Sequence, residues 1–375
     1  MQFRIDREKL LSVLQTVSRG LSVKTPMPIL TGIHLKATNE ELIFTTTNKE
    51  ISIRSTVENN SDFLTIYESG ECVVPGKYFL EIVKKAEGLT IDFSLYEGNA
   101  VKIVSERSDF TLTTHDKNNF PETNFELNGN EIELSTKELK QLIKQTSFAA
   151  ATSENRIILT SVNFNFNKGK LDVTATDSFR LAKKSIDTDL DIEETKLNIP
   201  GKALDELTKI LGDKQEKIKI SFGNNKILFK LEDTYFMTRL VEGVYPNTSS
   251  LFPTSYLLTT IFNKNDLLNA ADRASLFTSD SDLSIVKLRF TTDKRAELSS
   301  NSTEIGKVVE EINLVEMSEL LAFEIAFSSK YLIDALKAVE GELVEINFTG
   351  EIKPIVINAK NDKSALQLIL PVRVY

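Results

Sequence analysis

The 375-residue sequence predicts an α+β protein with three repeated domains, each made of two helices packed on antiparallel sheets. Three observations predict this fold class. An amphipathic helix, a strand that ends in a small polar pair, and a strand–helix–hairpin segment each occur three times, in the same order. A chance match of common helix and strand patterns does not explain an order that recurs three times. The predicted domains are residues 1–128, 129–255 and 256–375.

The first repeated feature is a helix that begins after a polar residue. Its copies are FRIDREKLLSVLQTVS at the start, IELSTKELKQLIKQTS and IFNKNDLLNAADRAS. Leu10 and Leu14 of the first copy lie one helical turn apart, which is typical of a helix with one apolar face. Asp6, Ser135 and Asn263 precede the three helices and are the side-chain types that cap a helix N-terminus.

The second repeated feature is a strand that ends in two small polar residues. The pairs are Thr47-Asn48, Thr176-Asp177 and Ser300-Asn301, which lie 129 and 124 residues apart. Such residues favour turns because their side chains hydrogen-bond to the backbone nearby. We therefore expect a tight turn at the same place in each domain.

The third repeated feature is a strand, a helix and a hairpin. Its helices lie in VVPGKYFLEIVKKAEG, NIPGKALDELTKILG and AFSSKYLIDALKAVEG, and the hairpins are expected to turn at Gly98, Gly223-Asn224 and Gly350.

The first copy superficially resembles a phosphate-binding loop, but Tyr78 occupies the place of the Ser or Thr whose hydroxyl binds magnesium in such loops. A turn that opens a helix is the better interpretation, with proline fixing the backbone angle.

Composition excludes several classes of protein. No apolar run is long enough for a membrane helix, and the N-terminus lacks the pattern of a signal peptide. A single cysteine, Cys72, rules out an internal disulfide framework, so we expect a cytoplasmic protein with no membrane association. Two isolated histidines, His34 and His115, do not form a zinc set. We expect no metal, no cofactor and no catalytic residues, so the protein is not an enzyme.

The charge is unevenly distributed along the chain. The net charge is −9, yet the six expected helices together carry +6 and the remainder −15. If the helices share one face, that face can hold phosphates without reading bases, while the acidic remainder repels other nucleic acid. The alternative is that lysine simply favours solvent-exposed helix positions. The expected helices are residues 7–19, 77–87, 136–145, 202–212, 263–274 and 330–339.

Four segments carry a resemblance to a known family. ATDSFRLA at Ala175–Ala182, PMPIL, VEGVYPNTSSLFP at Val241–Pro253 and the tail LILPVRVY occur in the expected order. With them the whole chain resembles the bacterial sliding clamps, the beta subunits of DNA polymerase III. The resemblance implies a head-to-tail homodimer that closes into a ring around duplex DNA and makes the replicative polymerase processive.

The resemblance also implies partners and site residues. The partners are duplex DNA, the catalytic subunit of the replicative DNA polymerase, a clamp loader, and repair polymerases and mismatch-repair proteins that bind through short linear motifs.

The implied peptide-binding pocket between domains 2 and 3 consists of Leu159, Thr176, Phe179, Arg180, Leu181, Pro246, Leu251, Ile352, Pro354, Leu368, Ile369, Leu370, Pro371, Val372 and Arg373. In it, Arg180 and Arg373 are expected to hold polar groups at the rim. The expected DNA-contacting residues are Lys24 and Arg156, which the resemblance implies, and the lysines of the basic helices, Lys84, Lys85, Lys137, Lys140 and Lys144. The implied dimer interface joins Phe110 and Leu112 to Leu276 and Phe277.

The chain departs from the family pattern at three positions. Phe179 stands where the family often has histidine or tyrosine, so that wall of the pocket lacks a hydrogen-bonding group. Lys24 replaces a frequent arginine and offers a point charge instead of a fork. Tyr375 extends beyond the usual last residue. Two other functions remain open from the residues alone: a monomeric peptide-binding scaffold without a DNA role, and a hydrolase that uses scattered carboxylates.

Overall fold

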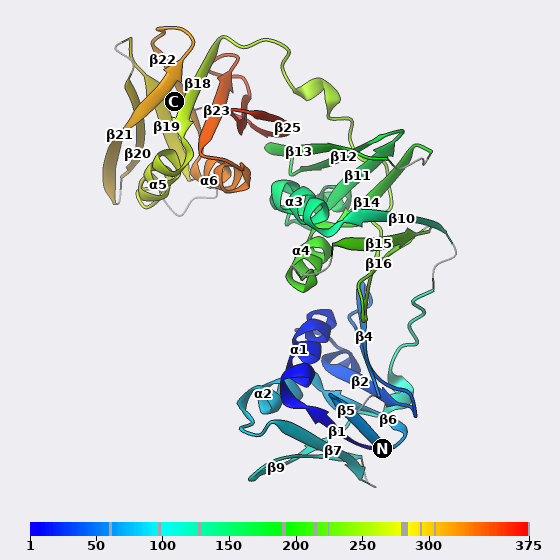
Figure 1. The fold of residues 1–375 in the computed structure, drawn as a ribbon. Helices are drawn as coiled ribbons and strands as arrows, with labels where there is room; N and C mark the ends of the chain where they lie inside the picture. Colours follow the sequence, from blue (N-terminus) through cyan, green and yellow to red (C-terminus); the bar gives the residue numbers. More distant parts are fainter. Residues whose placement is uncertain are drawn as a thin grey trace. The chain divides into compact units, whose positions relative to one another are not determined.

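The structure is a computed structural model. It describes residues 1–59, 62–96, 99–126, 129–189, 193–212, 216–223, 225–278, 284–292, 295–303 and 305–373. Gly98, Asn224, Tyr375 and Asn128, the expected last residue of the first domain, lie outside these residues. Within them the chain alternates helices and antiparallel strands in three similar stretches (Figure 1).

Each stretch contains two α-helices. One strand comes directly before each helix, and at least three strands follow it before the next helix. The first contains β1 (Gln2–Asp6), α1 (Arg7–Val17), β2 (Gly32–Ala37), β3 (Glu41–Thr47), β4 (Ile51–Glu58), β5 (Leu64–Glu68), β6 (Gly70–Pro75), α2 (Gly76–Lys85), β7 (Thr90–Tyr96), β8 (Ala100–Ser105) and β9 (Ser108–Thr113). The second contains β10 (Asn130–Ser135), α3 (Thr136–Thr146), β11 (Ser161–Asn167), β12 (Lys170–Thr176), β13 (Arg180–Asp187), β14 (Thr195–Pro200), α4 (Gly201–Ile210), β15 (Lys217–Phe222), β16 (Lys226–Lys230) and β17 (Thr234–Arg239). The third contains β18 (Leu258–Asn263), α5 (Lys264–Ser275), β19 (Ile285–Phe290), β20 (Arg295–Ser302), β21 (Gly306–Met317), β22 (Phe323–Ser328), α6 (Ser329–Ala338), β23 (Leu343–Phe348), β24 (Ile355–Ala359) and β25 (Asp362–Ile369).

The predicted helices are confirmed to within two residues at each end. The Asp6 side chain accepts a hydrogen bond from the Lys9 amide at 2.8 Å, and Asn263 accepts from the amides of Asn265 and Asp266. These are N-cap bonds, which satisfy amides that have no partner inside the helix. The expectation of a polar pair at the end of a strand is wrong in the third repeat, because β20 runs on to Ser302.

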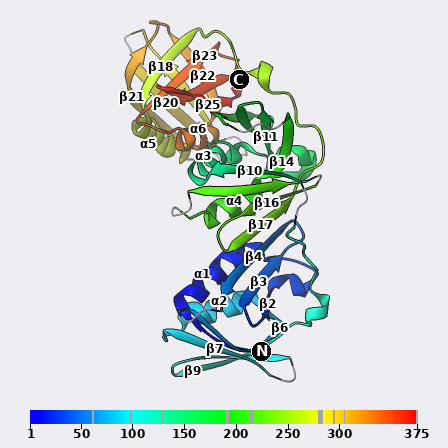
Figure 2. The same cartoon turned by 45° about the vertical axis from the view of Figure 1, so that its right-hand side comes forward.

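The strands form three sheets. Their orders are β5-β1-β7-β8-β9, then β10-β15-β16-β17-β4-β3-β2-β6, then β14-β11-β12-β13-β25-β24-β23-β18-β21-β20-β19-β22. In the second sheet β17 of the second repeat pairs with β4 of the first, and the two are neighbours in Figure 2. In the third sheet β13 pairs with β25. Each sheet of the middle repeat therefore continues the sheet of a neighbouring repeat.

This sharing of sheets explains why the contacts divide the chain into two compact units rather than three. One unit is residues 1–138 with 205–240, and the other is residues 139–204 with 241–375. Within the second unit, α5 and α6 lie side by side against the strands of the third repeat (Figure 1). Leu267 and Leu336 of these helices pack in one buried cluster with Phe290 and Phe348 of the sheets. Burial of such side chains supplies most of the stability of a layered fold.

Candidate protein-binding site at the junction of the second and third repeats

The second and third repeats join through the antiparallel strands β13 and β25. The register places Leu181 opposite Leu368. The pairing extends one step past the end of β25, because the amide of Leu370 donates to the carbonyl of Phe179 at 2.9 Å. The backbone of the predicted pocket is therefore a continuous ladder built from two repeats.

A tight turn precedes β13 and fixes the direction of the predicted pocket wall. Asp177 Oδ1 accepts hydrogen bonds from the amides of Phe179 and Arg180 at 2.9 and 3.0 Å. Thr176 Oγ1 accepts from the amide of Ser178 at 3.2 Å, and donates to the carbonyl of Arg180 at 2.6 Å. With all of these groups bonded, the turn holds Phe179 outward, and its side chain is 56% exposed. An exposed ring of this size on a fixed turn is typical of a contact surface.

Arg180 lies beneath this turn and is only 8% exposed. Its Nε donates to Asp177 Oδ2 at 2.9 Å and its Nη1 donates to Asp334 Oδ2 of α6 at 2.6 Å. The guanidinium also lies over the rings of Phe148 and Tyr331, at 5.4 and 4.6 Å from their centroids. Arg180 is thus bonded within the chain, and its expected contact with a ligand at the rim stays a prediction. Its charge is already neutralised by two carboxylates, and it fastens α6 to the turn before β13.

The apolar residues at this junction divide into a buried floor and an exposed surface. The floor is a cluster of Leu181, Val356 and Leu368, with Phe252, Leu366 and Leu370 packed against it. The exposed members are Phe179, Leu251 and Ile352. Of the remaining predicted pocket residues, Leu159, Thr176 and Ile369 are buried, Pro354, Pro371 and Val372 are half-buried, and Pro246 and Arg373 are exposed. An apolar floor beside exposed apolar side chains suits a short peptide with apolar anchors.

Tyr245 also belongs to this site, although the motif comparison did not select it. Its hydroxyl accepts a hydrogen bond from the amide of Thr176 at 3.0 Å and donates to the carbonyl of Ser161 at 3.5 Å. Burial raises the pKa of the Tyr245 phenol, so the group stays protonated. The sequence signal that could have identified Tyr245 as a site residue is its position directly before Pro246, within the family segment Val241–Pro253.

We expect Tyr245→Phe to destabilise the turn by about 1–2 kcal/mol, because the amide of Thr176 loses its partner while the ring keeps its packing. Equilibrium unfolding of the variant measures this loss. Tyr256→Phe, at a more exposed tyrosine, is the matched control and is expected to change stability by less than about 0.5 kcal/mol. An equal effect of both substitutions would contradict the assigned role of Tyr245.

The predicted DNA-contacting residues lie at the surface. Lys24, Lys84, Lys85, Lys137, Lys144 and Arg156 are exposed, and Lys140 is half-buried. Arg156 lies in a 3-10 segment, Glu154–Thr160, at a point where the backbone is not helical. Lys85 forms an ion pair with Glu81 at 3.3 Å, one turn away on α2. Exposed cations on helices can bind phosphates, but their contact with DNA stays a prediction.

The predicted dimer-interface residues lie on or near strand edges. Phe110 and Leu112 are half-buried on β9, the last strand of the five-stranded sheet, opposite Ile103 and Val101 of β8. Leu276, directly after α5, is 70% exposed. Phe277 beside it is half-buried. These positions leave apolar surface at both sites, while their contact across a dimer stays a prediction.

Comparison with known proteins gives the family. Models of the N-terminal, central and C-terminal domains of the DNA polymerase III beta subunit match residues 1–124, 133–247 and 249–373. The beta sliding clamp of Staphylococcus epidermidis is 40% identical over 380 residues, with all of both chains covered. The crystal structure of the Bacillus subtilis sliding clamp superposes with a TM-score of 0.92 at 39% identity, and the beta chain from Streptococcus pneumoniae with 0.93 at 34%, again over both whole chains.

The chain therefore belongs to the DNA polymerase III beta subunits, the sliding clamps. This membership confirms the predicted three-domain clamp fold and the predicted class of function, a processivity subunit that is not itself catalytic. Within the described residues, no helix is both long and apolar enough to cross a membrane.

Proposed function

We propose that two copies of this chain close head to tail into a ring around duplex DNA. The observation that carries the proposal is a pairing rule between the repeats. Each repeat has two halves of one strand, one helix and further strands, and the third strand after a helix pairs across to a neighbouring repeat. Thus β4 pairs with β17, and β13 pairs with β25.

Two of these third strands have no partner in another repeat within the described chain. They are β9, which pairs only with β8, and the Gly306–Asn313 part of β21, which pairs only with β20. By the same rule β21 of one copy pairs with β9 of another, and β9 of the first copy with β21 of the second. A contact between opposite ends of the chain closes after two copies if the rotation permits. Unpaired strand edges also favour such pairing.

The ring acts by topology rather than by affinity. Lys24, Arg156 and the lysines of α2 and α3 would make weak phosphate contacts that read no sequence and so permit sliding. The polymerase catalytic subunit would insert a short apolar segment into the pocket beside Phe179, which raises its effective concentration at the template. Repair polymerases and mismatch-repair proteins would compete for this pocket. The sequence lacks a complete phosphate-binding loop, so a separate ATP-driven loader is needed to open the ring.

The proposal extends to the limits of the domains and to the compartment. Domains of 1–128, 129–255 and 256–375 place each repeat of two helices in one domain. A single buried cysteine, Cys72, suits a reducing compartment, and we place the protein in the cytoplasm.

Retention on circular and linear DNA tests the ring. We load the protein on a nicked plasmid with a bacterial clamp loader and then raise the salt from about 50 to 200 mM. A protein held only by several phosphate contacts loses about 10³-fold or more of its affinity over this range. We expect the protein to stay on the circle and to leave once the plasmid is cut. Equal loss from both forms contradicts encirclement, and a monomer in sedimentation would favour a peptide-binding scaffold.

A further inference from the structure

The junction between the first and second repeats copies the turn of the candidate protein-binding site. Asn48 Oδ1 accepts hydrogen bonds from the amides of Glu50 and Ile51 at 3.0 and 2.7 Å, as Asp177 does from the two corresponding amides. Thr47 Oγ1 accepts from the amide of Lys49 at 3.2 Å, as Thr176 does from that of Ser178. Lys49 and Ser178 even share a left-handed backbone, with φ of 78° and 81°.

The strands that follow also correspond. The amide of Arg239 donates to the carbonyl of Glu50 at 3.1 Å, which matches the bond from Leu370 to Phe179. Beneath them Leu228 and Met237, in a buried cluster with Phe125, take the places that Val356 and Leu368 hold in the other junction. The segments FPET and YPNT cross the two junctions at Pro121 and Pro246. The two junctions are therefore structural copies.

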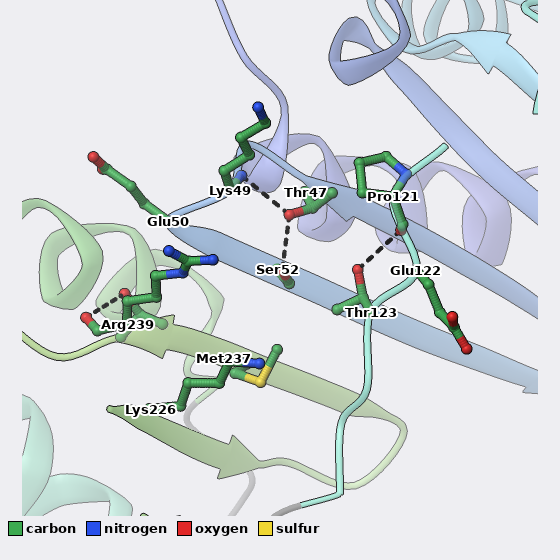
Figure 3. A pocket seen from close by; sticks show the side chains of 11 residues that line it. Thr47, Lys49, Glu50, Ser52, Pro121, Glu122, Thr123, Lys226, Met237 and Arg239 are labelled. Carbon is green, nitrogen blue, oxygen red and sulfur yellow. Dashed lines mark hydrogen bonds between the residues drawn. The ribbon is translucent and has the colours of Figure 1, made fainter. Parts of the chain in front are cut away.

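The first junction holds a cavity of about 120 Å³, whose lining includes Thr47, Ser52, Pro121, Lys226, Met237 and Arg239 (Figure 3). Its chemistry differs from that of the second junction. Where the second junction has Phe179, Leu181 and Leu370, the corresponding residues of the first are Glu50, Ser52 and Arg239. These three apolar side chains are replaced by polar and charged ones in the first junction, while buried Met237 keeps an apolar group in the floor.

Three cations line this cavity: Lys49, Lys226 and Arg239. In the part of the chain that the structure describes, none of them has a carboxylate within ion-pair distance. The carboxylates of Glu50 and Glu122 lie on opposite flanks of the group in Figure 3, and the Arg239 guanidinium points toward Ser52. Unpaired cations beside a small cavity favour a carboxylate ligand, because the ion pair is made where solvent is partly excluded.

We propose that this cavity is a second peptide-docking site, which takes an extended segment of a partner protein carrying a carboxylate next to an apolar side chain. The carboxylate pairs with Lys226 and Arg239, and the apolar side chain rests on Met237. The second junction selects apolar anchors and the first selects acidic ones, so two different segments can bind one subunit at the same time. The proposal rests on the internal repeat and does not depend on the DNA role.

Met237 provides a direct reporter for this site. The chain has four methionines, and ¹³C-methyl labelling gives each of them one NMR signal. The probe is a capped hexapeptide of alternating aspartate and leucine, with the asparagine–leucine hexapeptide as the comparison. We expect a saturable shift of the Met237 signal with the acidic peptide only, and Arg239→Glu or Lys226→Glu is expected to weaken binding at least tenfold.

Two matched variants make the outcome decisive. Lys363→Glu changes the net charge equally at an exposed lysine outside this junction and is expected to alter binding less than twofold. Phe179→Glu impairs the other junction and is expected to leave the Met237 shift unchanged, so failure of one site is distinguishable from failure of the other. The proposal is overturned if the asparagine peptide binds equally, if neither charge reversal weakens binding, or if oligothymidylate shifts Met237 and the acidic peptide does not.

Discussion

Replacement of Phe110 and Leu112 by aspartate is expected to convert the dimer into monomers and to abolish retention on circular DNA. Both side chains lie on the core-facing side of β9, opposite the buried residues Ile103 and Val101. They are half-buried in one chain, so a second chain paired with β9 would complete their burial. The aspartates would instead place charges in that contact, where desolvation opposes them.

The effect is large because a head-to-tail ring contains the same contact twice. Each apolar side chain contributes about 1.5 kcal/mol or more when it becomes buried. Two side chains at each of two contacts give a loss of about 6 kcal/mol, which corresponds to about 10⁴-fold in the dissociation constant. Sedimentation velocity across a range of micromolar concentrations measures the change in mass, and the plasmid assay measures retention.

The opposite edge of the same sheet provides the control. Thr65 and Tyr67 are exposed on β5, and their replacement by aspartate adds the same charge to the same sheet. We expect this control to remain dimeric and to stay on circular DNA. If both double variants dissociate equally, net charge rather than the β9 edge governs assembly, and the pairing of β9 with β21 has to be abandoned.

The repeated elements were predictable from the sequence because their signals are local. The helix after Asp6 needs only apolar residues at helical spacing and a side chain that caps its first turn, and both lie within about a dozen residues. The turns at Thr47-Asn48 and Thr176-Asp177 likewise depend on side chains that bond to nearby amides. Such features are independent of the rest of the chain.

Pairing between repeats was not predictable in the same way. The strand after Arg180 pairs with a strand near residue 369, and backbone hydrogen-bonding groups do not identify their partners. The role of Arg180 likewise depended on residues far along the chain. Its sequence neighbours indicate a turn, whereas Asp334 and Tyr331, which bury it, come from a helix about 150 residues further along the chain. The family motif found the residue but could not show that its charge was already used.

Arg180→Ala is therefore expected to loosen the junction itself rather than merely to remove a ligand contact. The substitution leaves Asp177 and Asp334 facing each other without a cation, and it removes the stacking on Phe148 and Tyr331. Breaking a buried ion pair from one side costs about 3–5 kcal/mol. Asp334 is partly exposed, so we expect the lower end, about 3 kcal/mol.

Hydrogen exchange locates this loss, because local opening of the β13–β25 pairing exposes its amides. About 3 kcal/mol corresponds to roughly 100-fold faster exchange in segments that contain Leu181 and Leu370. Arg180→Lys keeps the charge but loses the forked geometry, so we expect an intermediate rate. Arg373→Ala, at an exposed arginine, is expected to leave exchange unchanged.

Peptide binding separates the two roles that Arg180 could play. If the guanidinium fastens α6 to the turn, Arg180→Lys and Asp334→Asn both speed exchange and weaken peptide binding together, because the turn no longer holds Phe179 in place. If Arg180 contacts the peptide directly, Asp334→Asn leaves peptide affinity intact or strengthens it, since it frees the guanidinium. Exchange at wild-type rates in Arg180→Ala would show that packing of Leu181 and Leu368 holds the junction without the ion pairs.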